Sequence, residues 1–160
     1  MFLAANLCET NAQRKGAKPK TGKICGNPQI TCRNRDFNFE PHELGFELYQ
    51  GKSIIAESEV FYSIILKTVK IINADECATA VSEEERLEIQ KLFPNHKVFA
   101  LKCLEAGSVY YTNTADDVDF IAVYAGKTLA EAKKFLATVQ AAGKFKGANI
   151  RRMQAGINGT

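Results

Sequence analysis

The order of secondary-structure patterns between Phe61 and Met153 constrains the fold more than any other feature of this sequence. Residues 60–72 are dense in β-branched and aromatic side chains, which is typical of a buried central strand. Further strands are predicted over residues 97–102, 108–112, 118–125 and 148–153, with helices starting at residues 82 and 128. The overall order of strand, helix, strand, strand, helix, strand predicts an α+β domain over residues 60–157. Two helices would cover one face of an antiparallel, ferredoxin-like split βαβ sheet.

Both predicted helices have clear start signals. Ser82 with Glu85, and Thr128 with Glu131, have the spacing of a capping box, in which a hydroxyl and a carboxylate satisfy the first amides of a helix. Gly143 stands where a glycine commonly ends a helix. The apolar face expected for the second helix consists of Leu129, Ala132, Phe135, Leu136 and Val139.

The first third of the chain has a different character. Between Asn11 and Arg35 there are seven basic residues and no acidic one, and residues 16–23 are rich in glycine, proline and lysine. Such a stretch cannot bury enough apolar surface to order itself, so we expect a basic, irregular arm over residues 1–36. Residues 37–59 are expected to form a short β-rich cover, with strands over residues 45–49 and 53–56 joined by a turn.

Charge is distributed unevenly along the chain. Residues 36–132 carry 8 basic and 17 acidic residues, and every charged residue after Glu131 is basic. A basic arm can hold a polyanion through phosphate contacts, but more often it is solvated or folds back on an acidic body. The acidic middle argues against a dedicated nucleic-acid binder. No stretch reaches the ~18 consecutive apolar residues of a membrane span, so we expect none.

The spacing of the 5 cysteines bears on whether the protein is located in an oxidising compartment, where disulfides form. Cys25 and Cys32 bracket a turn-rich loop that a local disulfide can close. Cys77 and Cys103 fall at the same end of the predicted sheet, because the first two strands of a split βαβ fold point the same way. A second bridge is reachable there if the Cα atoms lie about 5.5 Å apart. Two bridges, with Cys8 left over, favour an extracytoplasmic location, periplasmic or secreted.

Two other interpretations of the cysteines stay open. In a cytoplasmic protein they would be small core residues. A metal site formed by Cys25, Cys32 and His42 lacks the Cys-x-x-Cys spacing typical of zinc, so we expect no metal.

No motif in the chain is typical of a catalytic or cofactor site. His42 and His96 fall in predicted loops without a partner at a meaningful spacing, and residues 126–128 lack the upstream glycine of a phosphate loop. We therefore expect no catalytic residues and no cofactor, and we interpret the chain as a non-enzymatic, extracytoplasmic binding or interaction module. The alternatives are a small enzyme with a Cys/His site between the N-terminal segment and the sheet, or a polyanion-binding protein that uses the basic arm.

Residues 120–136, with the sequence FIAVYAGKTLAEAKKFL, and residues 143–152 resemble the second half of a SPOR domain. The shared features are a strand ending in Gly126, a helix opening with Ala-Glu-Ala, a glycine near its end and a short closing strand. Outside this stretch only the element order matches. The first strand lacks the usual following glycine, and the interval from residue 72 to residue 82 is long. The alternative is an independent split βαβ domain of another family.

SPOR domains are bacterial βαββαβ modules that bind septal peptidoglycan, chiefly glycan strands stripped of stem peptides. The resemblance therefore implies peptidoglycan glycan, or another envelope protein, as the partner. The ligand would lie on an open sheet face, contacted by Lys67, Tyr124, Asn149 and Arg151, while the helices cover Ile121, Val123, Ala125 and Ile150. A tyrosine can stack on a sugar ring, and amide and guanidinium groups can donate to hydroxyls and carboxylates. Alternatively, Tyr124 packs under residues 37–49 and the arginines pair with the acidic middle.

Overall fold

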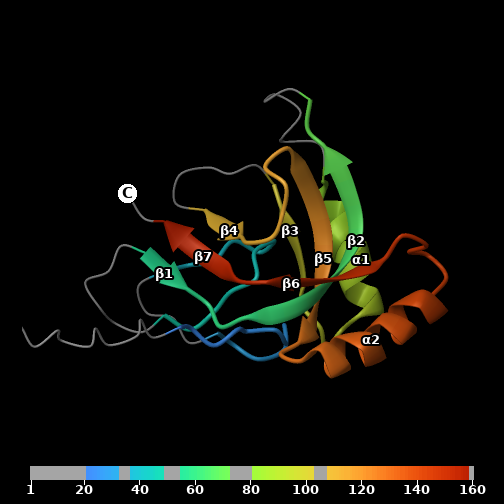
Figure 1. Cartoon of the computed structure of the whole chain (residues 1–160), viewed down its shortest axis with the longest axis horizontal. Coiled ribbons are helices and arrows are strands. Elements are labelled where there is room, and N and C mark those ends of the chain that lie inside the picture. Colours follow the sequence, from blue (N-terminus) through green and yellow to red (C-terminus); the bar gives the residue numbers. More distant parts are fainter. Residues whose placement is uncertain (1–20, 33–36, 49–54, 73–80, 103–107, 159–160) are drawn as a thin grey trace, which may run out of the picture.

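The described part of the chain is α+β, with two helices and two antiparallel sheets (Figure 1). The computed structural model describes residues 21–32, 37–48, 55–72, 81–102 and 108–158. Within these residues the elements are β1 (Ile55–Glu57), β2 (Phe61–Lys70), α1 (Glu83–Leu92), β3 (Val98–Leu101), β4 (Val109–Tyr111), β5 (Val118–Gly126), α2 (Leu129–Ala141), β6 (Asn149–Met153) and β7 (Ala155–Asn158).

The larger sheet has the strand order β3-β5-β2-β6, and every pair of neighbours is antiparallel. β2 lies inside this sheet, as its apolar sequence predicts, because a strand covered on both faces needs few polar residues. The pairing of β2 with β5 has irregular register between Tyr62 and Ser63 and again between Ile65 and Lys67. The second irregularity changes which face the following side chains occupy.

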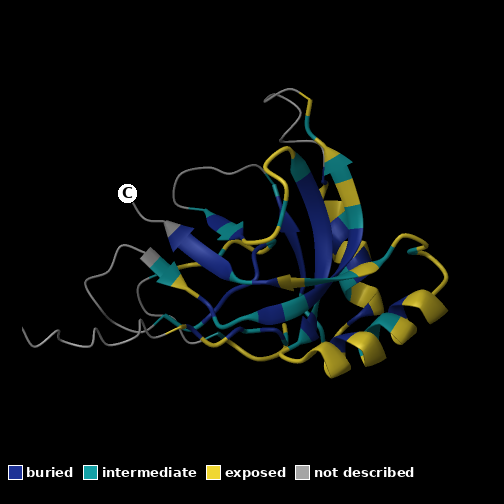
Figure 2. Ribbon diagram, viewed as in Figure 1, coloured by how far each residue is buried: buried dark blue, intermediate teal, exposed yellow. Residues whose placement is uncertain are grey.

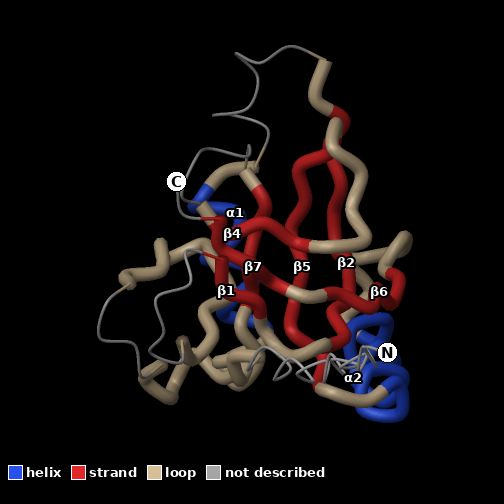
Figure 3. Tube along the Cα trace, turned by 60° about the vertical axis from the view of Figure 1, so that its left-hand side comes forward, coloured by secondary structure: helices blue, strands red, loops and turns tan. Residues whose placement is uncertain are grey.

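Both helices cover the same face of the larger sheet (Figures 1 and 3). The core on this side includes the predicted strand residues Ile121, Val123 and Ala125, and it continues into α1 and α2. In α2, Ala132 and Val139 are buried, and Phe135 and Leu136 pack against this core. Leu129 departs from the predicted face: the residue is 44% exposed, and the buried stripe starts one turn later at Ala132.

The helix ends follow the predicted chemistry, with one difference. The capping box of Thr128 and Glu131 is complete at α2, and Gly143 adopts a φ of 71° just after that helix. At α1, Ser82 accepts a hydrogen bond from the Glu85 amide at 3.1 Å. The carboxylate of Glu85 binds the Lys67 ammonium at 2.7 Å instead of turning back to the cap, so only half of that box forms.

The smaller sheet, β1-β7-β4, was not predicted from the sequence. The strand at residues 108–112 was placed in the main domain, but β4 pairs with β7, which follows β6 after the single residue Gln154. β1 also pairs with β7 and not with the described residues 45–48. Strand patterns reveal a strand but not its partner, which depends on residues far away in the sequence. Residues 49–54, which would have completed the expected hairpin, lie outside the described ranges.

The face of the larger sheet away from the helices is covered, whereas the SPOR resemblance implied that it was open. Phe61, Phe99 and Phe120 on this face share a core with residues of the smaller sheet and of the N-terminal segment, among them Ile24, Leu44, Phe46, Val109, Tyr111 and Ile157. Figure 2 shows that β5 of the larger sheet and β7 of the smaller sheet are largely buried. A long ligand therefore cannot lie flat along this face.

Residues 21–32, expected to belong to an irregular arm, contain no helix or strand but are tied to the fold. Gly22 forms a bridge with Ser58, and Ile24 forms one with Phe46. Cys25 and Cys32 form a disulfide, as predicted, with their Cα atoms 5.5 Å apart. Cys8, Cys77 and Cys103 lie outside the described residues, so the second bridge stays a prediction.

Candidate functional site

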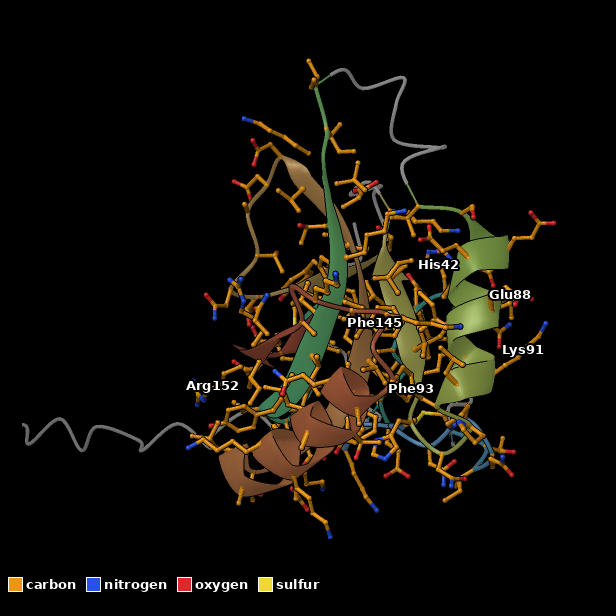
Figure 4. All side chains as sticks on the ribbon, turned by 90° about the vertical axis from the view of Figure 1, so that its right-hand side faces the viewer. His42, Glu88, Lys91, Phe93, Phe145 and Arg152 are labelled. Carbon is orange, nitrogen blue, oxygen red and sulfur yellow. A yellow bond between two sulfur atoms is a disulfide. The ribbon has the colours of Figure 1, made fainter. Side chains whose placement is uncertain are left out.

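A pocket of about 670 Å³ opens between α2, the end of β5 and the loop joining α1 to β3. This volume is in the range of small-ligand sites. Its apolar wall includes Leu92, Phe93, Ala125 and Phe135. Its polar groups come from Asn95, His96, Lys127, Glu131, Lys134 and Thr138, and Tyr124 also contributes to the lining. We call this site the α2 pocket. Figure 4 shows Phe93 at the base of α1, next to α2, whereas Glu88 and Lys91 lie on the outer side of α1.

His96 is held in one orientation at the wall of the pocket. Its ring stacks on Phe135 with centroids 3.8 Å apart and an interplanar angle of 12°. Its Nδ1 lies 2.9 Å from the carbonyl oxygen of Tyr124. A carbonyl oxygen only accepts, so Nδ1 must carry the hydrogen and the neutral ring keeps its lone pair at Nε2. No hydrogen bond from another described residue reaches Nε2.

The loop that carries His96 is fixed by α1. The side-chain amide of Gln90 donates to the carbonyl oxygens of Phe93 and His96 at 2.8 and 2.9 Å, and its oxygen accepts from the Val98 amide at 2.9 Å. Phe93 packs edge-on against Phe135 with centroids 5.5 Å apart. The apolar wall is therefore preformed by a short loop between two rigid elements.

The carboxylate of Glu131 caps the start of α2. One carboxylate oxygen accepts from the amides of Lys127 and Thr128, both at 2.8 Å, and from the Thr128 hydroxyl at 3.0 Å. These hydrogen bonds stabilise the ionised form and lower the pKa of Glu131. Gly126 has a φ of 123°, and a Cβ there would lie 2.7 Å from the Cβ of Glu131. The glycine is needed for the close approach of Glu131.

Lys127 forms an ion pair, and Tyr124 is partly buried near two carboxylates. The Lys127 ammonium lies 2.8 Å from a carboxylate oxygen of Glu59, and the same oxygen accepts from the Ile24 amide at 3.0 Å. Burial of Tyr124, with the nearby charges of Glu59 and Glu131, raises its pKa to about 12. Its hydroxyl therefore stays protonated in neutral solution and can donate or accept a hydrogen bond.

Among the lysines that line the pocket, Lys134 is the one that forms no ion pair with a described residue. It is exposed on α2 and takes part in none of the ion pairs formed by the described part of the chain. No cysteine or serine lines the pocket, and its carboxylate is fixed by backbone amides.

Three of the predicted contact residues share a face of the sheet, and one does not. Tyr124 and Arg151 both pair with Ser63, and Asn149 pairs with Ile65, so these three side chains lie on the face away from the helices. Lys67 lies on the helix face, where it binds Glu85. The irregular register between Ile65 and Lys67 breaks the simple alternation that placed Lys67 with the others.

The structure does not join these residues into one open surface. Tyr124 lies over Gly26 and packs against Phe61, with ring centroids 6.0 Å apart. Arg151 donates to the carbonyl oxygen of Asn113 at 3.1 Å. Of the predicted contacts, Tyr124 is the one that lines the α2 pocket. The other pocket groups could not be found from the sequence, because loop and helix residues meet there only after folding.

The described residues do not bring a free cysteine and a histidine together, as the alternative Cys/His site would need. Cys25 and Cys32 are joined to each other, and neither offers a free thiol. His42 lies near Lys102 and Glu83, and its pKa is lowered by burial and then by the Lys102 charge. Cys77 and Cys103 fall outside the described ranges.

Comparison with known proteins found no match to a family model, to a curated protein or to a solved structure. Neither α1 nor α2 is long and apolar enough to cross a membrane.

Proposed function

We propose that this protein is a non-enzymatic binding module of an extracytoplasmic compartment and that it binds a glycan in the α2 pocket. The observation that carries the proposal is the state of the pocket's polar groups. Glu131 is held by three hydrogen bonds and Lys127 by an ion pair, which leaves them little capacity to transfer protons. The pocket is nevertheless preformed, and its wall is largely apolar.

The mixture of surfaces fits a sugar. Pyranose rings have an apolar C–H face that packs on aromatic and aliphatic groups, while their hydroxyls need several donors and acceptors. The α2 pocket offers both kinds of surface: apolar groups from Phe135 and Leu92, and polar groups from Asn95, Thr138 and the Nε2 of His96. Fixed polar groups on a rigid wall reduce the entropy lost on binding.

The fold supports a SPOR-like origin for the module, although the site is moved. With one helix after β2 and one after β5, the strand order β3-β5-β2-β6 is compatible with a split βαβ, ferredoxin-like arrangement. The covered sheet face is the main departure from the SPOR domains that the sequence resembles. We therefore place the ligand at the end of β5, where Tyr124 still takes part, and retain peptidoglycan as the first glycan to test.

The disulfide supports the proposed extracytoplasmic location. A bond between Cys25 and Cys32 is favoured outside the reducing cytoplasm. Peptidoglycan and other surface glycans are found in the same oxidising environment. The proposed location and the proposed ligand are therefore compatible.

Co-sedimentation with purified peptidoglycan sacculi tests the proposal. Thr138→Trp would fill the pocket from α2, and Ala137→Trp places the same ring on an exposed neighbour outside the pocket lining. We expect the wild type and the Ala137 variant to sediment with the sacculi and the Thr138 variant to stay in solution. An Arg151→Ala variant tests the sheet-face site that the resemblance implies. No retention of folded wild type would refute peptidoglycan binding, and equal retention of both tryptophan variants would exclude the α2 pocket.

A further inference from the structure

We propose that the glycan extends from the α2 pocket into a second cavity, between α1 and the disulfide loop of residues 25–32, so that the protein binds a chain of several sugars. This inference rests on the proposed function and adds a second part to the site and the length of ligand that it takes. It starts from the observation that the two cavities share a residue.

The second cavity has a volume of about 640 Å³, close to the 670 Å³ of the α2 pocket. We call it the loop cavity. Pro94 lines both cavities, so they adjoin at the C-terminal end of α1. The other groups of the loop cavity that matter here come from α1 and from the disulfide loop: Glu84, Leu87, Glu88, Lys91, Pro28 and Gln29. Figure 4 shows Glu88 and Lys91 on the outer side of α1.

Each cavity has an exposed leucine of α1 in its wall. Leu87 in the loop cavity is 46% exposed, and Leu92 in the α2 pocket is 40% exposed. One exposed leucine is ordinary on a protein surface, whereas apolar groups gathered at adjoining cavities are typical of a binding site. Pro94 is exposed as well. A chain that passes over Pro94 would cover both leucines.

The loop cavity offers the mixture of surfaces that a sugar needs. Leu87 and Pro28 provide apolar surface for the C–H face of a ring. Glu88 and Lys91 form an ion pair at 2.6 Å. Glu84 is exposed and takes part in none of the ion pairs or side-chain hydrogen bonds formed within the described ranges. Its carboxylate can therefore accept hydrogen bonds from sugar hydroxyls.

The wall formed by the disulfide loop is tied to the same residues that border the α2 pocket. The Cys25–Cys32 bond closes the loop. The Gln29 side chain donates to the Pro94 carbonyl at 3.3 Å, and the Gly26 carbonyl accepts from the Lys97 amide at 2.8 Å. The two cavities are therefore held in a fixed relation, which limits the entropy lost when one chain occupies both.

The experiment measures affinity against chain length. A disaccharide and an octasaccharide are prepared from the same peptidoglycan sacculi, freed of peptides, and each is titrated into the full chain by isothermal titration calorimetry. We expect the octasaccharide to bind about tenfold more tightly, because its second contact forms within one complex.

A matched pair of variants in the disulfide loop shows where the additional affinity comes from. Gln29→Trp would fill the loop cavity, whereas Ile30→Trp places the same ring on an exposed neighbour that lines neither cavity. Gln29→Trp should remove the advantage of the octasaccharide, and the disaccharide should bind as before. Ile30→Trp should keep the advantage. An advantage that arises only from the many equivalent units of a long chain would survive in both variants.

A second pair tests the apolar contact on α1. Leu87→Ala should weaken octasaccharide binding about two- to fivefold, because it removes apolar surface that the chain covers. Leu129→Ala is the control: this leucine is 44% exposed, close to the 46% of Leu87, and lies outside both linings. Its substitution should leave the affinity unchanged.

Amide NMR spectra give a direct readout. The disaccharide should shift amide signals around the α2 pocket, such as that of Thr138. The octasaccharide should shift these and also the amide signals of Gln29 and Leu87 in the loop cavity.

Equal affinity for the two fragments, or a length advantage that Gln29→Trp and Leu87→Ala leave intact, would overturn this inference while the proposed glycan function stands. Octasaccharide binding without a shift at Gln29 and Leu87 would overturn it as well. If neither fragment binds and the folded protein does not sediment with sacculi, both proposals are refuted.

Discussion

The backbone amide of Leu44 donates a hydrogen bond of 2.9 Å to the hydroxyl oxygen of Tyr111, and both groups are buried. This bond joins the N-terminal segment to β4, in the core between the two sheets. The Tyr111 ring packs with Phe99 and Phe120 at centroid distances of 5.0 and 5.7 Å. The side chain therefore provides both packing and the acceptor for an amide that water cannot reach.

Tyr111→Phe should keep the packing and lose the acceptor. We expect the free energy of unfolding to fall by about 1–3 kcal/mol, the usual cost of an unsatisfied buried amide. Tyr110→Phe is the matched control: its hydroxyl makes an exposed contact of 3.5 Å with Glu57, and its removal should change stability by less than about 0.5 kcal/mol. Urea denaturation measures both. Equal stability of the two variants would show that Leu44 finds another acceptor.

Gly126→Ala should destabilise the start of α2. A side chain at a φ of 123° is strained, and the new Cβ would collide with Glu131 and displace the capping box. We expect a loss of about 2–4 kcal/mol, measured by thermal denaturation. Gly147→Ala is the control, because a Cβ there meets nothing within 4 Å. If both variants melted together, the close approach at Gly126 would not matter for stability.

Lys97 should make stability depend on pH. Burial, and next the charge of Arg86, lowers its pKa to about 8, well below the unfolded value of about 10.4. The folded chain therefore gives up this proton at a lower pH than the unfolded chain. The cost of burying the charge is present in full below about pH 8 and disappears as the pH rises toward about 10.

Lys97→Met removes this charge. We expect its stability relative to the wild type to fall by on the order of 1 kcal/mol between about pH 7 and pH 9.5, since part of the side chain still reaches solvent. The ammonium also donates to the Pro41 carbonyl at 2.7 Å, which limits the gain from the substitution at neutral pH. Lys91→Met, at an exposed position on α1, should give a flat difference. The same slope in both variants would mean that Lys97 is not the source.

Replacing Cys25 and Cys32 by alanine should lower the free energy of unfolding by about 2–3 kcal/mol, as expected for a short disulfide loop. Reductant should lower the melting temperature of the wild type by more than that of the double variant. Thiol titration of the unfolded chain should find at least these two cysteines blocked before reduction. Five reactive thiols in material from an oxidising compartment would contradict the disulfide and the proposed location.

Local signals made part of the fold predictable. Ser82 and Thr128 start the helices because capping depends on a few adjacent residues, and the apolar run of β2 indicates burial without reference to its partners. The smaller sheet was not predictable, because β4 and β1 find β7 only through distant packing. The side of Lys67 was missed for a different reason: alternation fails at an irregular register that has no clear sequence signature.

The candidate site was even less accessible from the sequence. Tyr124 was singled out by its place in a strand and does line the α2 pocket. His96 and Phe135 lie far apart in the sequence, and their stacking depends on how α2 crosses the sheet. A histidine in a loop has no periodicity that marks it as part of a site. Lys134 likewise resembles any solvent-facing lysine of a helix, and nothing near it in the sequence shows that it lines a pocket.

Gln154 alone separates β6 from β7, and this short connection has a consequence for cooperativity. β6 is an edge strand of the larger sheet, and β7 is the middle strand of the smaller one. The Gln154 side chain donates to the Ser58 carbonyl at 3.1 Å, which anchors the joint to the segment between β1 and β2. Unfolding of either sheet would disrupt the residues around Gln154 that the two sheets share. The two sheets should therefore unfold in a single transition and not as separable domains.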